Sequence, residues 1–391
     1  MIKVNRQELM DEGYIILRGV IPSDELEYLR EGYEALIRCE WPDGMPVDHF
    51  QPRIHRFYAH IDEATAHTVE LCLGENTLGV VRQLMPGLEA GPAGWYLMCN
   101  PVRDHGPWFW HRDFCPPTEG PLVGMQMDFL ANGPVYLQWN IALYDDDVFW
   151  VVPRSHRRPN TEAEDQQLAA VPHAYANRQT PKPGIRHTPL PESVCVDLKA
   201  GDAVVYTNML LHWGSNYSAK LRRCIHMGYR GFGAPMFHHQ GFDRDVRFTR
   251  YLSSESRALY QRLISCYDQE CDAMEAVFRA ILDKNEENFR MNLTILHPGE
   301  SWRFVCLIHL CKYVQRMQNG GDSEFSPRFT GEEIGALWLL FRPLDDALQD
   351  ENPVMKPGFQ IPGPTRYRCN ELPEQFGINE FIASWNNECY V

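Results

Sequence analysis

The sequence predicts an α+β protein whose core is mainly β, and two changes of pattern along the chain indicate this. From Trp95 to Tyr229, short apolar runs rich in aromatic and β-branched residues alternate with clusters of Pro, Gly, Asn and Asp. Many short strands with such spacing are typical of a β-sandwich or barrel. After about Arg250, apolar residues recur at helical spacing instead. We therefore expect a β-rich domain over residues 1–250 and a helical extension over residues 251–391.

A strand and a helix are predicted at the start of the chain. The run Gly13–Ile21 (GYIILRGVI) is rich in β-branched residues and is followed by Pro22. Ser23 has the side chain of a helix N-cap, and two acidic residues follow it, where the helix macrodipole favours negative charge. We expect the helix to run from there to about Leu36.

Six further segments are predicted as core strands because each is short, apolar and bounded by turn residues. They are WYLMC (95–99), VYLQWNIAL (135–143), FWVVP (149–153), SVCVDL (193–198), DAVVYTNMLLH (202–212) and RCIHMGY (223–229). Period two places Gln138 and Asn140 on one face of their strand, where they either contact a bound small molecule or pack as ordinary polar residues. The acidic run 145–147 is predicted to be a solvated turn.

The extension is predicted to hold three helices. The first follows apolar residues at helical spacing from Leu259 to Ile281, and the second runs from about Ser301 to Met317, before two glycines that stop it. The third begins at Thr330, which forms a capping box with Glu333. These helices carry no catalytic pattern, and they are candidates for covering the barrel, for shaping the substrate entrance or for a homo-oligomer contact.

Composition and charge narrow the classes of function. The 391 residues are 44% hydrophobic, enough for a packed core, and the formal net charge is −15. Such an acidic chain lacks the basic footprint of a nucleic-acid-binding protein and would be repelled by anionic membrane surfaces. The start of the chain is polar, and no apolar run reaches about eighteen residues. Twelve scattered cysteines without a CxxC pair complete the expectation of a cytoplasmic protein in a reducing compartment.

An H-x-D pair and a distant histidine indicate a metal site. His111 and Asp113 lie at the end of an apolar stretch (WFWHRDF), and in a strand residues i and i+2 point to the same face. His212 ends another apolar run about a hundred residues later. Two imidazoles and one carboxylate form the ligand set of non-haem Fe(II) oxygenases, which leaves adjacent coordination positions open. An isolated H-x-D pair is also compatible with a solvated strand end, so the downstream residues decide the interpretation.

Those downstream residues resemble the phytanoyl-CoA dioxygenase family. His111-Arg-Asp113 is followed by the turn Val151-Val-Pro-Arg-Ser-His-Arg157 and then by His212-Trp-Gly-Ser-Asn-Tyr-Ser218, with arginines at positions 222 and 223. The opening segment GYIILRGVIPSDELEYLR is similar to the start of that family too. The resemblance covers roughly residues 8 to 232. It implies a double-stranded β-helix, a jelly-roll or cupin-like barrel, with the metal at one mouth.

The resemblance also implies the cofactors. Fe(II) would be held by His111, Asp113 and His212, with 2-oxoglutarate and O₂ as cosubstrates. A guanidinium would bind the distal carboxylate of 2-oxoglutarate bidentately, with help from the hydroxyl of Ser218. Spacing from Ser218 favours Arg222 for this role, whereas spacing from His212 would favour Arg223. Gln138 and Asn100 are further candidates for contacting the cosubstrate.

Three departures from the family pattern concern loops rather than ligands. The turn before the Ser155-His156-Arg157 element (the SHR turn) is short. Arg154 stands where the family usually has glycine, and the interval from His212 to Asn216 is one residue shorter than in many members of the family. The carboxylate of Asp113 is present, whereas related halogenases replace it by a small residue. We therefore expect an oxidoreductase that hydroxylates or otherwise oxidises a small-molecule metabolite, with release of succinate and CO₂. The alternatives are a barrel-fold metal-dependent hydrolase and a non-catalytic metal-binding barrel protein.

Overall fold

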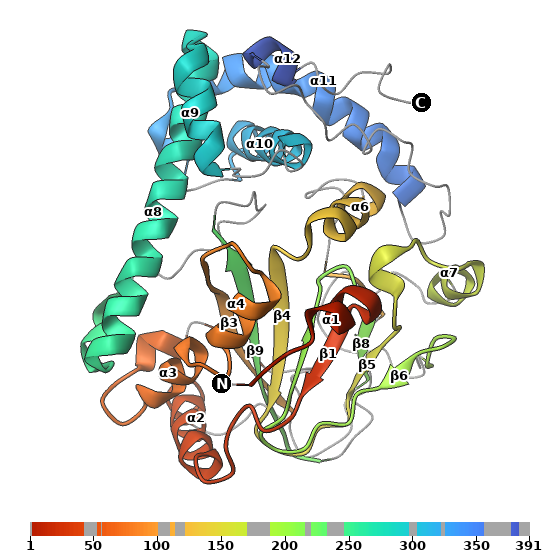
Figure 1. Ribbon diagram of the computed structural model, residues 1–391, viewed down its shortest axis with the longest axis vertical. Coiled ribbons are helices and arrows are strands. Elements are labelled where there is room, and N and C mark those ends of the chain that lie inside the picture. Colours follow the sequence, from red (N-terminus) through yellow and green to blue (C-terminus); the bar gives the residue numbers. More distant parts are fainter. Residues whose placement is uncertain are drawn as a thin grey trace.

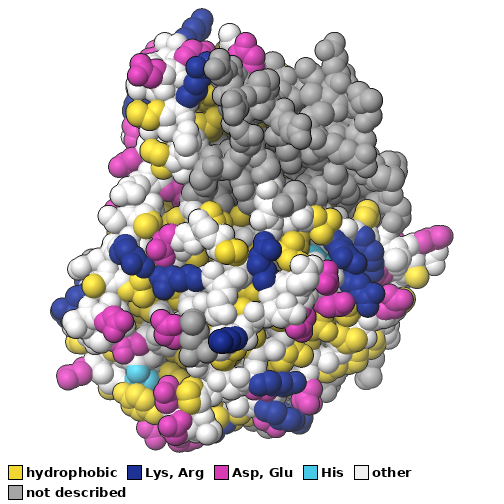
Figure 2. Space-filling model, in the orientation of Figure 1, with side chains coloured by type: hydrophobic (Ala, Val, Ile, Leu, Met, Phe, Trp, Pro, Cys, Tyr) yellow, Lys and Arg dark blue, Asp and Glu magenta, His cyan; other side chains and the backbone are white. Residues whose placement is uncertain are grey.

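The computed structural model places two antiparallel β-sheets among helices (Figure 1). It describes residues 2–42, 53–55, 57–100, 110–113, 122–169, 188–215, 220–232, 246–296, 303–321, 325–355 and 377–382. Within these ranges, no helix combines the length and the apolar composition that crossing a membrane requires. Figure 2 shows acidic side chains interspersed with basic ones over the visible face of the molecule.

The larger sheet has six strands in the order β1-β7-β4-β9-β3-β2, and the smaller has three in the order β6-β5-β8. The strands are β1 (Tyr14–Leu17), β2 (Arg53–His55), β3 (Ala90–Asn100), β4 (Tyr136–Ala142), β5 (Phe149–Val151), β6 (Val194–Cys195), β7 (Ala203–Tyr206), β8 (His212–Gly214) and β9 (Arg222–Gly231). An isolated bridge adds His111 beside β8.

The chain winds back and forth between the two sheets. From β3 in the large sheet it passes to the His111 bridge beside the small one, returns through β4, crosses to β5 and β6, and comes back through β7. It then crosses once more to β8 and ends the barrel in β9. This winding, with large-sheet neighbours β3-β9-β4-β7, is consistent with the double-stranded β-helix that the sequence led us to expect.

The two faces of the large sheet differ in chemistry. On β4, Leu137, Trp139 and Ile141 point to the outer face and join the main hydrophobic core beneath the helices. The alternate residues Gln138 and Asn140 point to the inner face, toward the small sheet, as period two predicts. Apolar residues of both sheets, including Phe149 and Tyr206, close part of this inner space. The polar residues of the barrel interior are therefore gathered on one face.

Helices cover the sheets at both ends of the sequence. The N-terminal part contains α1 (Arg6–Glu12), α2 (Leu26–Glu40), η1 (Phe57–His60), α3 (His67–Leu73), α4 (Leu78–Leu84), α6 (Leu122–Asn132), η2 (Ser155–Arg157) and α7 (Glu162–Ala169). The C-terminal part contains η4 (Val246–Tyr251), α8 (Ser254–Asp283), α9 (Glu286–Leu296), α10 (Arg303–Gln318), η6 (Ser326–Arg328), α11 (Gly331–Met355) and α12 (Ile378–Ile382). Figure 1 shows α8 along one side of the molecule.

The predicted helices of the extension are confirmed. The backbone N–H of Thr330 donates to the Glu333 carboxylate at 2.7 Å and the N–H of Glu333 donates to the Thr330 hydroxyl at 3.2 Å, so the capping box ahead of α11 is formed. Gly320, in the left-handed conformation at φ 69°, follows the end of α10. The main hydrophobic core contains residues of the barrel and of these helices alike. The division of the chain at residue 250 stays a prediction.

Two local predictions are wrong. Helix α2 starts at Leu26 with Glu25 as its N-cap, because Pro22–Glu25 form a turn first (Glu25 N–H to Pro22 O, 3.0 Å), and Ser23 makes no cap. The segment 202–212 is not one strand: it is β7, then a turn, then β8. The hydroxyl of Thr207 accepts from Met209 N at 3.2 Å in that turn. The turn moves the chain from the large sheet to the small one.

Candidate metal centre

His111, Asp113 and His212 come together at the edge of the small sheet. His111 and His212 lie directly opposite each other, joined by His111 N–H to His212 O (3.0 Å) and His212 N–H to His111 O (2.9 Å). Opposed residues of an antiparallel pair share a face, so the imidazoles meet with ring centroids 4.3 Å apart. The Asp113 carboxylate lies 3.3 Å from the Nε2 atom of each. One ligand atom from each residue falls within 4.8 Å of the others.

His212 is held in the state that a metal ligand needs. Its Nδ1 lies 2.8 Å from the carbonyl oxygen of Leu210, and because a carbonyl can only accept, Nδ1 carries the proton. The Nε2 lone pair is thereby left toward Asp113 and His111. Burial, reinforced by the nearby His111, lowers the pKa of His212 and favours the neutral imidazole.

Asp113 is the accessible member of the three. Its side chain is 35% exposed against 5% for His212, so the centre opens on the side of the carboxylate. Burial raises the pKa of the Asp113 carboxyl, but its electrostatic interactions and hydrogen bonds with His212 and His111 outweigh this and hold the pKa well below its usual range. Gln138 Nε2 donates to Asp113 Oδ2 at 2.7 Å, while Gln138 Oε1 is buried without a hydrogen-bond partner among the described residues. Gln138 thus contacts the Asp113 carboxylate, and its contact with the cosubstrate stays a prediction.

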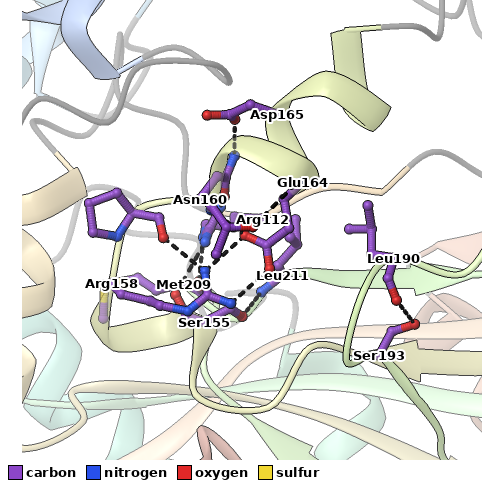
Figure 3. Close-up of polar contacts among 12 residues, drawn as sticks. Arg112, Ser155, Arg158, Asn160, Glu164, Asp165, Leu190, Ser193, Met209 and Leu211 are labelled. Atoms are coloured by element: carbon purple, nitrogen blue, oxygen red, sulfur yellow. Dashed lines mark hydrogen bonds and ion pairs between the residues drawn. The ribbon is translucent and has the colours of Figure 1, made fainter.

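Arg112, between His111 and Asp113, points into the SHR turn (Figure 3). Its Nε donates to Met209 O at 2.8 Å, its Nη2 donates to Ser155 O at 3.2 Å, and its Nη1 donates to the side-chain oxygen of Asn160. The hydroxyl of Ser155 accepts from Leu211 N, next to His212, at 2.8 Å. Burial lowers the pKa of Arg112 to about 10, so it is still charged at neutral pH. The family-like turn thus contacts both ligand-bearing segments.

The turn also explains the departure at Arg154. This residue has φ 66°, in the left-handed region that favours glycine and costs other residues about 1 kcal/mol. Its backbone N–H donates to Glu12 O at 2.9 Å, and its guanidinium pairs with the Glu12 carboxylate at 3.2 Å. The tie to Glu12 stabilises the conformation that glycine would adopt freely. His156 follows it, fully buried, with Nε2 3.0 Å from Met10 O.

The two adjacent arginines of β9 face opposite ways. Arg222 lies on the inner face, nearly buried, and its Nε donates to Asp146 Oδ2 at 2.7 Å. Its other two guanidinium nitrogens make no hydrogen bond to the described residues. Arg223 lies on the outer face, where its Nε donates to Glu34 Oε1 of α2 at 2.7 Å. Of the two candidates, Arg222 is therefore the one inside the barrel.

Asp146 is the residue that the sequence interpretation missed. The acidic run 145–147 was predicted to be solvated, yet Asp146 is 4% exposed and accepts from Val148 N (2.9 Å) as well as from Arg222. The one available signal was the shortness of the turn, which leaves few residues between β4 and β5. Its flanking residues Asp145 and Asp147 are more exposed and pair with surface lysines, as expected.

The remaining candidates are placed less completely. Asn100 ends β3 directly opposite Arg222 in the ladder with β9. Ser218 lies outside the described residues. Asn140 Oδ1 lies 2.7 Å from His226 Nδ1 on the inner face, and the ring of Tyr96 stacks near that histidine at 5.9 Å. A polar row therefore extends along the inner face from Gln138 toward Arg222.

The donor set fits a divalent metal. Two imidazole nitrogens and one carboxylate oxygen converge on one side of the small sheet, and hydrogen bonds with Leu210 and Gln138 orient His212 and Asp113. Arg222 has two guanidinium nitrogens, Nη1 and Nη2, that could donate to an anion. Fold and site together define a protein of two antiparallel sheets with a two-histidine, one-carboxylate cluster that could hold a metal ion.

Comparison with known families gives this class a name. Residues 9–224, more than half of the chain, match the family model described as phytanoyl-CoA dioxygenase (PhyH). The chain belongs to the phytanoyl-CoA dioxygenase family, which makes it an enzyme of the iron- and 2-oxoglutarate-dependent oxygenase type. The resemblance read from the motifs is confirmed. No curated protein matches the chain.

Solved structures similar to the chain are distant in sequence. EctD from S. alaskensis, solved with 2-oxoglutarate and 5-hydroxyectoine, is 19% identical, with 61% of this chain and 79% of that one covered and a TM-score of 0.42. HygX from Streptomyces hygroscopicus, solved with nickel and 2-oxoglutarate, is 17% identical, with coverages of 58% and 87% and a TM-score of 0.42. The epimerase SnoN from nogalamycin biosynthesis is 18% identical, with coverages of 58% and 79% and a TM-score of 0.40.

Proposed function

We propose that the protein is an Fe(II)- and 2-oxoglutarate-dependent dioxygenase that hydroxylates, or otherwise oxidises, a small-molecule metabolite within a double-stranded β-helix barrel. The observation that carries the proposal is the convergence of His111, Asp113 and His212 within 4.8 Å, in a chain of this family. Because Asp113 supplies the carboxylate, the centre has the ligand set of an oxygenase and no vacant carboxylate position of the kind that halogenases use.

Iron and its cosubstrate would supply the activation of O₂, with succinate and CO₂ as the coproducts. The protein residues bind and orient. His212 keeps its proton on Nδ1 through Leu210 O and presents Nε2, and Gln138 fixes one oxygen of the Asp113 carboxylate. The apolar residues around Tyr206 and Phe149 keep water from the side of His212, because both rings lie within 5.5 Å of its imidazole.

Arg222 is the proposed anchor of the distal carboxylate of 2-oxoglutarate. Asp146 holds Nε and fixes the plane of the guanidinium, which leaves Nη1 and Nη2 for a bidentate contact. Asn100, opposite Arg222 in the ladder, is the proposed additional contact, and Ser218 keeps the role that its position in the motif suggests. Arg223 cannot serve, because it is on the other face of β9 and pairs with Glu34.

The test is an anaerobic titration of the apo-protein with Fe(II) and then with 2-oxoglutarate, which follows the weak visible charge-transfer band of the chelate. The double variant Arg222→Gln/Asp146→Asn removes the anchor without leaving a buried unpaired charge, and Arg223→Gln/Glu34→Gln is its matched control on the outer face. The proposal expects the band in wild type and in the control, and its loss in the first variant at the same cosubstrate concentration. Iron binding without the band in wild type would contradict the cosubstrate assignment and favour a hydrolase.

A further inference from the structure

The segment Trp110–Asp113, which carries two of the three proposed ligands, joins the small sheet through one bridge. Among the described residues, its backbone hydrogen bonds are the two exchanged by His111 and His212, at 3.0 and 2.9 Å. This bridge fixes the separation of His111 and His212. The orientation of Asp113 relative to His212 also depends on the side-chain contacts of the segment.

Arg112 supplies that support from the opposite face of the segment. Its guanidinium donates to three acceptors in three different places: Met209 O in the turn before β8, Ser155 O in the SHR turn, and the side chain of Asn160 before α7 (Figure 3). The last acceptor is itself fixed, because Asn160 Nδ2 donates to Asp165 Oδ1 at 3.0 Å. The side chain of Arg112 thus joins this segment to three other places in the described part of the chain.

The same turn holds the other ligand-bearing segment. The hydroxyl of Ser155 accepts from the backbone N–H of Leu211 at 2.8 Å, and Leu211 immediately precedes His212. Ser155 therefore contacts Arg112 through its carbonyl and Leu211 through its hydroxyl. We propose that Arg112 is a positioning residue that sets the placement of His111 and Asp113 relative to His212, through the SHR turn. The inference rests on the proposed metal site.

An arginine is required at this position for a geometric reason. The guanidinium is a rigid planar fork with five donors, so it can reach three acceptors that lie in different directions. A lysine ammonium is a compact point charge that cannot span them. We therefore expect Arg112→Lys to keep the charge of the segment and to lose the placement of the ligands.

The experiment measures Mn(II) affinity by the loss of the free-ion electron paramagnetic resonance signal. Both Arg112→Ala and Arg112→Lys should bind Mn(II) about 10- to 100-fold more weakly than wild type, the range seen when groups that orient metal ligands are removed. The matched control carries Arg158→Gln together with Glu164→Gln, so that no buried carboxylate is left unpaired: it removes the ion pair between the end of the SHR turn and α7 but no contact to a ligand-bearing segment. Its Mn(II) affinity should equal that of wild type. Arg112→Lys, which keeps most of the side-chain volume, continues the test if Arg112→Ala does not fold.

Chemical rescue separates positioning from a merely structural role. Guanidinium ion at millimolar, non-denaturing concentration should restore the Mn(II) affinity of Arg112→Ala and should not affect the Arg158→Gln/Glu164→Gln control. The visible absorption spectrum of bound Co(II) should differ from that of wild type in both Arg112 variants. It should return to the wild-type shape in Arg112→Ala when guanidinium is added. Wild-type affinity in both Arg112 variants, or equal losses in the Arg158→Gln/Glu164→Gln control, would overturn the inference alone. A wild-type protein that binds no divalent metal would overturn the proposed function together with it.

Discussion

The large and the small sheet differ in what holds their strands in place. In the large sheet β3, β9 and β4 are 11, 10 and 7 residues long and pair over most of their length, so the backbone itself fixes their register. In the small sheet β5, β6 and β8 have only 3, 2 and 3 residues, and the ligand-bearing segment 110–113 joins by an isolated bridge. There, hydrogen bonds of side chains such as Arg112 and Ser155 connect the segments.

The difference separates stability from function. The register of the large sheet is fixed by backbone hydrogen bonds, and its outer residues belong to the main hydrophobic core. The three proposed ligands lie at the small sheet, where a few specific hydrogen bonds hold their segments. Substitutions in the outer face of the large sheet should lower the free energy of unfolding without disturbing the centre. Substitutions around the ligands should disturb the centre with little change in stability.

The largest contrast is expected between Asp113→Ala and Ile141→Ala. Loss of the carboxylate ligand should weaken Fe(II) binding by more than the roughly 100-fold that outer groups contribute, and should abolish succinate release. Ile141→Ala, in the buried outer face of β4, should cost about 2–5 kcal/mol of unfolding free energy and keep the metal affinity of wild type. Isothermal titration and chemical denaturation of both variants measure this, and an active Asp113→Ala enzyme would contradict the ligand assignment.

The next effect concerns the two faces of β9. Removing the inner pair by Arg222→Gln/Asp146→Asn should raise the KM for 2-oxoglutarate about 100-fold, because hydrogen bonds to a charged partner are worth about 1.5–3 kcal/mol each. The outer pair, replaced by Arg223→Gln/Glu34→Gln, should leave this KM unchanged. Steady-state assays of succinate release at saturating O₂ provide the comparison. Equal effects of the two double variants on this KM would show that the inner face of β9 does not bind 2-oxoglutarate.

A pH effect is expected from the SHR turn. Burial lowers the pKa of His156 from 6.5 to about 4. Between these two pH values His156 is therefore protonated in the unfolded chain and neutral in the folded chain. Stability should therefore fall as pH decreases from about 6.5 to 4, by at most about 3 kcal/mol. Urea unfolding across this range should show a flatter profile in His156→Gln than in wild type. Parallel profiles would mean that His156 does not contribute.

The smallest effect is expected at Gln138, which lies in the large sheet but reaches the ligand Asp113. Gln138→Leu keeps the size of the side chain and removes the donor 2.7 Å from the carboxylate. Mn(II) affinity should fall about 10-fold, with a small change in the unfolding midpoint. An unchanged affinity would mean that the large sheet contributes nothing to metal placement, which would sharpen the contrast between the sheets further.

Much of this arrangement could be predicted from local pattern. The clustering of His111, Asp113 and His212 was predictable, because i, i+2 spacing in an extended segment puts His111 and Asp113 on one face and the motif around His212 supplied the third member. The choice between the arginines needed more: Ile225, Met227 and Tyr229 belong to the main core, and by period two they place Arg223 outside and Arg222 inside. The core that these residues join is known from the structure, whereas the sequence offered only the spacing from Ser218 and from His212.

Other features depended on contacts between distant segments. The burial of Asp146 follows from the pairing of its loop with Leu198 and from Arg222, which lies 76 positions away. The break between β7 and β8 begins at Thr207 and Asn208, two polar residues within an otherwise apolar run, and the single turn-favouring Asn208 did not outweigh the apolar residues around it. The support from Arg112 depends on carbonyl groups of the backbone, and no residue type in the sequence records where these point.

The hydrophobic core shared by the sheets and the C-terminal helices has a consequence for truncation of the chain. Helix α8 packs against α3, and its Glu270 forms a buried ion pair with Arg230 of β9. Deletion of the extension would uncover apolar surface of the main core and would remove the carboxylate that pairs with Arg230. The helices therefore act as part of the folding unit of the sheets, and a chain cut at residue 250 is expected to be less stable than the full chain.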